Sequence, residues 1–159
     1  MPYKMIWYVD GGCRGNGYPD AVGAAAAVRR TRYKTWTYRR KLPYDELLAI
    51  ITALKQSLRV YEELGGRPWL DVTIHSDSRY AVSCMKEWVY KWSRNGYINA
   101  AGYAVANQDL IREASDLEDE LIELGGVTWK WIPRGDNETA DSACREILDE
   151  MEEERWMYF

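Results

Sequence analysis

Four acidic residues are the side chains in this sequence whose types and spacing best suit chemistry: Asp10, Glu46, Asp77 and Asp141. Asp10 ends an apolar run at residues 5–9, and Asp77 follows a second apolar run at residues 69–75. Ligands of open α/β sheets gather beyond the carboxyl ends of parallel strands, so these two acids would share one sheet edge if the strands are parallel neighbours. Glu46 and Asp141 lie in the first turns of two predicted helices, from which both could point to the same place.

Carboxylates that converge in this way need a neutralising partner. Two like charges about 4 Å apart cost roughly 4 kcal/mol at an effective dielectric constant of 20. Oxygen ligands without His or Cys suit Mg²⁺ or Mn²⁺, and two such ions about 4 Å apart can activate a water and stabilise the leaving oxygen of a phosphodiester. The alternative interpretation is that Asp10 and Asp77 are turn and cap residues, while Glu46 and Asp141 are helix N-terminal acids placed for the dipole.

The elements that must position these acids follow from periodicity and turn residues. Apolar or alternating segments predict five strands, at residues 5–9, 21–30, 34–42, 69–75 and 127–132. Apolar stripes at helical spacing predict four helices, which begin near Asp45, Ser78, residue 110 and Asn137; the first three end at Gly65-Gly66, Asn95-Gly96 and Gly125-Gly126. The order βββαβααβα favours an antiparallel meander followed by right-handed crossovers. The predicted fold class is α/β, a mixed five-stranded sheet flanked by helices.

Composition and charge restrict the class of protein. A length of 159 residues, 47% of them hydrophobic, favours one domain with a substantial core. The formal net charge of −4 alone argues against a nucleic-acid partner, but residues 29–41 carry seven basic side chains while residues 149–154 are acidic. This separation permits a basic binding face on an acidic protein. No segment has the roughly 20 apolar residues of a membrane span, and the first residues lack the apolar region of a signal peptide, so we expect a cytoplasmic protein.

The three cysteines, Cys13, Cys84 and Cys144, are scattered and form no CxxC pair. They therefore indicate neither a disulfide framework nor a zinc site. We expect thiols in or near the core.

Four segments occur in an informative order: DGGCRGN at 10–16, ELLAIITAL at 46–54, SDSRY at 76–80 and NETADSA at 137–143. They resemble the motifs of the type 1 ribonuclease H family. The resemblance implies the ribonuclease H-like fold in a single domain, 1–159, without a separate hybrid-binding domain. It also implies a monomeric endonuclease that hydrolyses the RNA strand of RNA–DNA hybrids and leaves 5′-phosphate and 3′-hydroxyl ends. The four acids would hold two Mg²⁺ (or Mn²⁺) ions.

The resemblance assigns substrate-binding residues as well. The backbone at Gly11, Gly12 and Cys13 and the side chain of Asn16 would contact the RNA, including its 2′-hydroxyl groups. Asn16 could instead be an ordinary turn residue. Arg79 stands where the family commonly has Gln; it could reach a minor-groove acceptor or a phosphate, or simply be solvated.

A second part of the resemblance concerns the DNA strand. Trp88, Trp92 and the segment to Asn107 resemble the handle region with which the family grips that strand. The alternative is that both tryptophans belong to the stripe of residues that a helix buries in the core.

Two segments depart from the family pattern. The usual Thr-Asn-Asn turn before the second acid is replaced by KLPYDE at 41–46, so Asp45 competes with Glu46 for that role, although Asp45 could be the N-cap and leave Glu46 in the first turn. The Gly-His loop before the last helix is absent, and the short link resembles that of the archaeal and plant-type branch. His75, the only histidine, is interpreted as a satisfied core or edge residue. Arg134 is the candidate for a partial substitute, through contact with phosphate.

Alternative functions remain open. Another nuclease of the wider fold, an exonuclease or a resolvase, is one alternative; exonucleases of this fold have Glu two residues after the first Asp, where this sequence has Gly12. A non-catalytic nucleic-acid-binding module is another. The aromatic tail at residues 155–159 either packs back onto the domain or docks on a partner protein.

Overall fold

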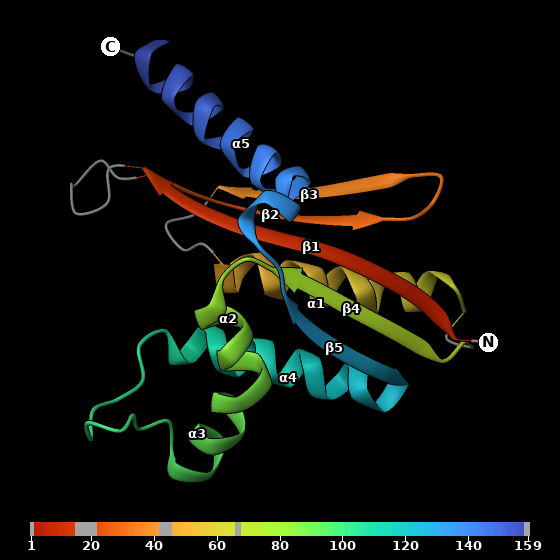
Figure 1. Ribbon diagram of the computed structural model, residues 1–159, viewed down its shortest axis with the longest axis vertical. Helices are drawn as coiled ribbons and strands as arrows, with labels where there is room; N and C mark the ends of the chain where they lie inside the picture. Colours follow the sequence, from red (N-terminus) through yellow and green to blue (C-terminus); the bar gives the residue numbers. More distant parts are fainter. Residues whose placement is uncertain (1, 15–21, 42–45, 66–67, 158–159) are drawn as a thin grey trace.

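A five-stranded mixed sheet forms the framework of the molecule (Figure 1). The computed structural model describes residues 2–14, 22–41, 46–65 and 68–157. The strand order is β3-β2-β1-β4-β5, in which β1 pairs antiparallel with β2 and parallel with β4. The strands are β1 (Tyr3–Arg14), β2 (Val22–Arg30), β3 (Thr35–Lys41), β4 (Leu70–Ser76) and β5 (Gly125–Trp131). The predicted fold class, with its antiparallel meander and parallel crossovers, is confirmed.

Helices cover both faces of the sheet, which buries the alternate residues of each strand. Helix α1 (Glu46–Glu63) packs on the face that carries Met5, Trp7 and Val9, and α4 (Gln108–Leu124) packs beside it. Helix α5 (Glu138–Met157) packs on the opposite face, against the small side chains of Ala24 and Ala26 and against Val28. Among the described residues, no helix is long and apolar enough to cross a membrane.

The helix predicted after Ser78 is interrupted. The Ser78 hydroxyl caps it by accepting a hydrogen bond from the Ala81 N–H (3.1 Å), as expected. However, α2 (Arg79–Ser83) gives way to a π-helical turn at Cys84–Trp88 before α3 (Val89–Asn95). The Val89 N–H donates to the Cys84 carbonyl, five residues back, so the turn holds one residue more than an α-helical turn. Gly96, in a left-handed conformation (φ 77°), ends α3 as predicted.

The helix predicted from residue 110 ends at Gly125-Gly126 as expected, but the next strand begins there as well, two residues earlier than predicted. Helix α4 runs directly into β5, and Gly125 pairs with Leu70 of β4. A Cβ atom on Gly125 would lie 1.9 Å from the Leu70 carbonyl oxygen, so the missing side chain is what permits this close approach. The sequence predicts that the last helix begins near Asn137. In the structure a 3-10 turn at Arg134–Asp136 precedes α5, and Asn137 lies just before the helix.

Buried thiols and a satisfied histidine agree with the sequence-based expectations. Cys84 and Cys144 are buried thiols, and β1 includes Cys13. The His75 Nδ1 atom lies 3.1 Å from the Trp7 carbonyl oxygen, and its ring stacks on Tyr8. His75 is therefore a hydrogen-bonded, half-buried residue of an interior strand.

Candidate active site

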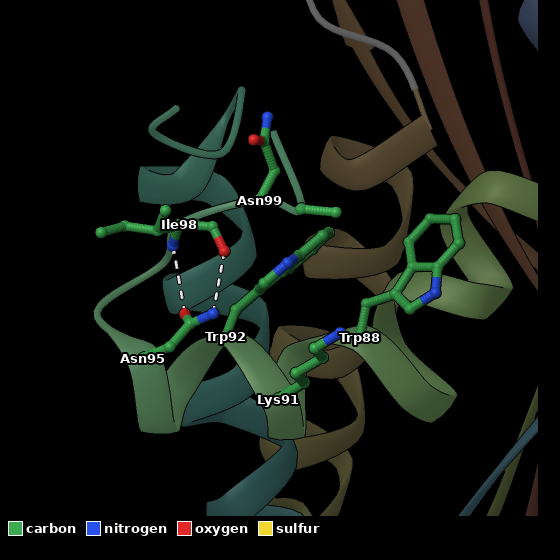
Figure 2. A pocket seen from close by; sticks show the side chains of 7 residues that line it. Trp88, Lys91, Trp92, Asn95, Ile98 and Asn99 are labelled. Carbon is green, nitrogen blue, oxygen red and sulfur yellow. Dashed lines mark hydrogen bonds between the residues drawn. The ribbon is translucent and has the colours of Figure 1, made fainter. Parts of the chain in front are cut away.

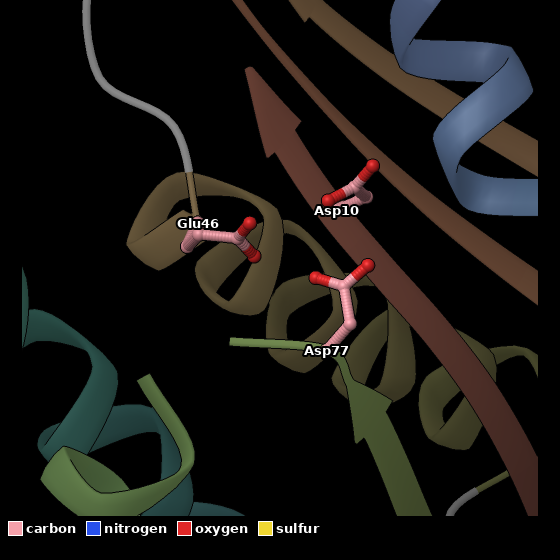
Figure 3. Close-up of side chains that lie close together, drawn as sticks. All are labelled: Asp10, Glu46 and Asp77. Carbon is pink, nitrogen blue, oxygen red and sulfur yellow. The ribbon is translucent and has the colours of Figure 1, made fainter. Parts of the chain in front are cut away.

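Three of the predicted acids meet at one edge of the sheet (Figure 3). Asp10 lies on β1, Asp77 directly follows β4, and Glu46 is the first residue of α1. One carboxylate oxygen from each lies within 4.8 Å of the others. The parallel register, in which Val9 of β1 pairs with Ser76 of β4, brings Asp10 and Asp77 to the same level.

Burial and mutual repulsion raise the pKa values of two carboxyl groups in this cluster. Burial, followed by the Asp77 charge, raises the pKa of Asp10 from 3.8 to about 7. Burial, followed by the charges of Asp10 and Asp77, raises the pKa of Glu46 from 4.5 to about 9, although the Gly11 N–H donates a hydrogen bond that lowers it. The described protein groups around the cluster therefore do not stabilise all three carboxylates in their ionised form. The donors of the cluster are all carboxylate oxygens, a set that fits a hard divalent cation.

Asp141 lies beside this cluster and is held differently. It shares a hydrogen bond with Asp10 but is not among the three acids whose oxygens converge within 4.8 Å. Arg145, one turn along α5, is hydrogen-bonded to Asp141, and an Arg134 amino group lies 3.7 Å from its carboxylate. Burial favours a higher pKa for Asp141, but these hydrogen bonds and the two arginine charges outweigh it and lower the pKa.

Asn137 is a residue of the site to which the sequence assigned no role. Its buried side-chain amide donates to the Val9 carbonyl oxygen (2.8 Å) and lies 3.4 Å from Oδ2 of Asp77. It therefore ties the start of α5 to the middle of β1 and to the end of β4. Its position in the NETADSA motif was the available signal, but only the tertiary contacts reveal what its amide does.

Arg79 and Trp131 form the rim next to Asp77. The Arg79 guanidinium stacks on the Trp131 ring at 4.1 Å, and the Trp131 indole N–H donates to the Asp77 carbonyl oxygen (3.0 Å). Arg79 is exposed, so its charge faces solvent beside the carboxylates. Arg134 is also exposed, at 83% of its side chain.

The predicted RNA-contacting residues are placed only in part. Gly11, Gly12 and Cys13 continue β1 beyond Asp10, whereas Asn16 lies outside the described residues. A Cβ atom on Gly12 would lie 3.3 Å from Cδ1 of Leu148, so close packing of α5 is one reason for this glycine.

An aromatic pocket lies on the helices that follow β4 (Figure 2). It has a volume of about 240 Å³, and its lining residues include Trp88, Lys91, Trp92, Asn95 and Ile98. Trp88 is 37% exposed and Trp92 half-buried, so the interpretation of Trp88 as a core residue is wrong; the π-helical turn rotates it out of the stripe. Asn107, exposed before α4 in a left-handed conformation, is not one of the residues that line this pocket.

Comparisons with known proteins agree with this arrangement. A family model described as RNase H matches residues 2–148. The Ribonuclease H of Pseudomonas entomophila (strain L48) is 31% identical over 155 residues, covering 93% of this chain and 95% of the relative.

Solved structures share the fold at lower identity. The foamy viral protease-reverse transcriptase in complex with dsDNA matches with a TM-score of 0.69 at 18% identity, covering 91% of this chain and 93% of that chain. LC11-RNase H1 in complex with RNA/DNA hybrid matches with a TM-score of 0.64 at 18% identity, covering 92% of this chain and 98% of that chain. These likenesses show the fold, and the family model, which spans nearly the whole sequence, shows more: the chain belongs to the RNase H family.

Proposed function

We propose that this protein is an endonuclease that hydrolyses the RNA strand of RNA–DNA hybrids and leaves 5′-phosphate and 3′-hydroxyl ends. The observation that carries the proposal is the convergence of Asp10, Glu46 and Asp77 where the parallel pairing of β1 with β4 ends, in a member of the RNase H family. A relative of the same fold has been solved in complex with RNA/DNA hybrid, which supports the same substrate class.

The three converging carboxylates would hold two Mg²⁺ or Mn²⁺ ions, with Asp141 completing the set. Bound there, such ions would activate a water and stabilise the leaving oxygen of the phosphodiester. Asn137 holds Asp77 in place through its amide. Arg145 and Arg134 keep Asp141 ionised, and the exposed Arg134 is the group we propose to contact phosphate where the family commonly has histidine.

The substrate would lie across the rim of this site. Gly11, Gly12 and Cys13 offer strand backbone beside Asp10, the position proposed to contact the RNA 2′-hydroxyl groups. Arg79, stacked on Trp131, offers its charge to a phosphate or to a minor-groove acceptor. Trp88 and Lys91 pair a partly exposed ring with a positive charge, which suits the DNA strand; Asn16 and Asn107 stay predictions.

The link between β5 and α5 bears on which branch of the family the protein resembles. Residues 132–137 read IPRGDN and contain no histidine. We propose that the protein works like the archaeal and plant-type branch, which lacks the Gly-His loop.

The decisive test is the cleavage of a labelled RNA–DNA hybrid by the wild type and by Asp77→Asn, with Mg²⁺ or Mn²⁺. Loss of several kcal/mol of charge stabilisation predicts a decrease in rate of about 10³-fold. Asp71→Asn, on β4 near its opposite end, is the matched control and should cleave normally. Unchanged cleavage by Asp77→Asn would refute the assignment of the metal site.

Substrate class is tested by offering the wild type double-stranded RNA, double-stranded DNA and single-stranded RNA beside the hybrid. We expect strong preference for the hybrid. Equal cleavage of all four would refute the substrate claim. Products that shorten only from one end would favour an exonuclease, and binding of the hybrid without cleavage would favour a non-catalytic module.

A further inference from the structure

A buried arginine lies in the sheet away from the carboxylate cluster. Arg29 of β2 is 6% exposed, and its Nε and Nη1 atoms have no hydrogen-bond partner among the described residues. Its guanidinium stacks on the ring of Trp36 at 4.0 Å. Stacking on a ring attracts the charge but leaves the N–H donors without acceptors, and a buried charge is costly unless it is both paired and hydrogen-bonded.

Arg29 borders a pocket of about 310 Å³ between β3 and the second half of α1. Trp36 and Tyr38 supply aromatic walls, while Gln56 and Arg59 supply further donors. Its volume is at the lower end of the range for small-molecule sites and is enough for a phosphate group with a ring attached.

The charge around this pocket is positive. Among the described residues that line the pocket, Glu63 is the only acid; its carboxylate lies 3.7 Å from Nε of Arg59 and is mostly exposed. Lys34 adds a further positive charge, with its ammonium 4.9 Å from the centroid of the Trp36 ring. Within the described part of the lining, Arg29 therefore has no carboxylate of its own.

We propose that this pocket binds a phosphate group, with Arg29 as the anchoring cation and Arg59 at its mouth. The planar guanidinium fork matches the geometry of a phosphate oxyanion, and the rings of Trp36 and Tyr38 can contact an attached base. Two sources share this chemistry: a free nucleotide and a backbone phosphate of a nucleic acid.

The pocket is distinct from the carboxylate cluster. Arg29 pairs with Trp7 in the sheet, three residues before Asp10 on β1. Arg59 follows Glu46 by 13 residues of α1, about 20 Å along the helix. If no phosphate binds here, the assignment of the metal site at Asp10, Glu46 and Asp77 still stands, so the two proposals can fail separately.

The test is a titration of the wild-type protein with sodium phosphate, followed by NMR at the arginine Nε–H and tryptophan indole signals. Sodium chloride at matched ionic strength is the reference. We expect saturable shifts at Arg29 and Trp36 in phosphate alone. Shifts that do not saturate, or that chloride reproduces, would overturn the proposal.

Three variants locate the binding site. Arg29→Met should weaken phosphate binding at least tenfold, and Arg59→Gln, at an exposed residue that the fold does not require, should weaken it several-fold. Arg112→Gln is the matched control, because Arg112 also stacks on a ring, that of Tyr97 at 4.2 Å, but lies outside this pocket. Equal affinity in Arg59→Gln and the wild type, with any folded Arg29→Met also unchanged, would overturn the assignment.

Two further measurements separate the sources. If the ligand is a free nucleotide, AMP binds more tightly than inorganic phosphate, and Arg59→Gln leaves the affinity for an RNA–DNA hybrid unchanged. If the ligand is a backbone phosphate, Arg59→Gln weakens hybrid binding and makes the negative slope of log affinity against log salt less steep by about one.

Discussion

Replacing Asp10 by Asn should stabilise the protein when no divalent cation is present. The pKa of Asp10 is about 7 in the folded protein and 3.8 in the unfolded chain. Because the folded state binds the proton more tightly, the stability that this proton contributes is complete below pH 3.8 and is lost as pH rises through 7. At 1.36 kcal/mol for each tenfold change in proton affinity, the loss at higher pH amounts to about 4 kcal/mol.

An asparagine at position 10 removes the charge but remains a buried polar group. We therefore expect recovery of about half of that loss, or about 2 kcal/mol, at pH 8. For a domain of this size, 1 kcal/mol corresponds to roughly 2–4 °C in melting temperature, so the expected increase is about 4–8 °C.

The assay is thermal unfolding by circular dichroism in a chelating buffer at pH 5 and pH 8, and again with Mg²⁺. The melting temperature of the wild type should fall from pH 5 to pH 8 by more than that of Asp10→Asn. Mg²⁺ should stabilise the wild type more than the variant, since the variant has lost a ligand.

Asp71→Asn supplies the control, because it changes the net charge equally from a half-buried position on β4 outside the cluster. It should shift the unfolding free energy by no more than about 0.5 kcal/mol. If Asp10→Asn were less stable than the wild type in chelator at pH 8, burial and the neighbouring carboxylates would not destabilise the Asp10 charge as argued.

Three further substitutions test separate parts of the structure. Asn137→Ala should cost about 1–3 kcal/mol in urea unfolding and lower hybrid cleavage, because the Val9 carbonyl oxygen and the Asp77 carboxylate both lose a donor. Gly125→Ala should cost about 3 kcal/mol or more by the same measurement, since its Cβ would overlap a backbone carbonyl; a loss below about 1 kcal/mol would mean that β5 shifts easily. Tyr90→Phe should cost about 1 kcal/mol at pH 7, because the buried Glu118 loses the 2.6 Å hydrogen bond from the Tyr90 hydroxyl. That bond raises the pKa of Tyr90 to about 12, so wild-type stability should fall between pH 10 and pH 12 more steeply than that of Tyr90→Phe in a melting-temperature series.

The sheet and the three converging acids could be predicted because local patterns determine them. An apolar run that ends in an acid places Asp77 at the end of its strand, whereas Asp10 lies where the parallel pairing with β4 ends and β1 itself continues to Arg14 against β2. The change from period two to helical period indicates which strands are reached through helices. Asp10 and Asp77 follow from this reasoning, and Glu46 follows from the helix that begins there. The closeness of Asp10 and Asp77 then follows from the parallel pairing of β1 with β4.

Features set by tertiary contacts could not be predicted in the same way. Gly125 ends α4 as the sequence predicts, but only the proximity of Leu70 reveals why a glycine is also needed as the first residue of β5. In the sequence, Trp88 fits the apolar stripe of a regular α-helix. The π-helical turn that places its side chain outward has no signal in that pattern. The sequence predicts Asp141 beside the other acids, but it does not indicate that Arg145 and Arg134 contact its carboxylate or that it lies outside the group of three.

The position of Asn137 in the chain bears on when the site can form during synthesis. Its amide bonds the carbonyl oxygen of Val9, 128 residues earlier, and reaches Asp77 as well. A growing chain carries all three converging acids well before it carries Asn137 and α5. The carboxylates would therefore gain their final support only when the last helix leaves the ribosome and docks on β1 and β2. A protein truncated before residue 137 would contain all three converging acids and still lack the amide that bonds Val9 and Asp77.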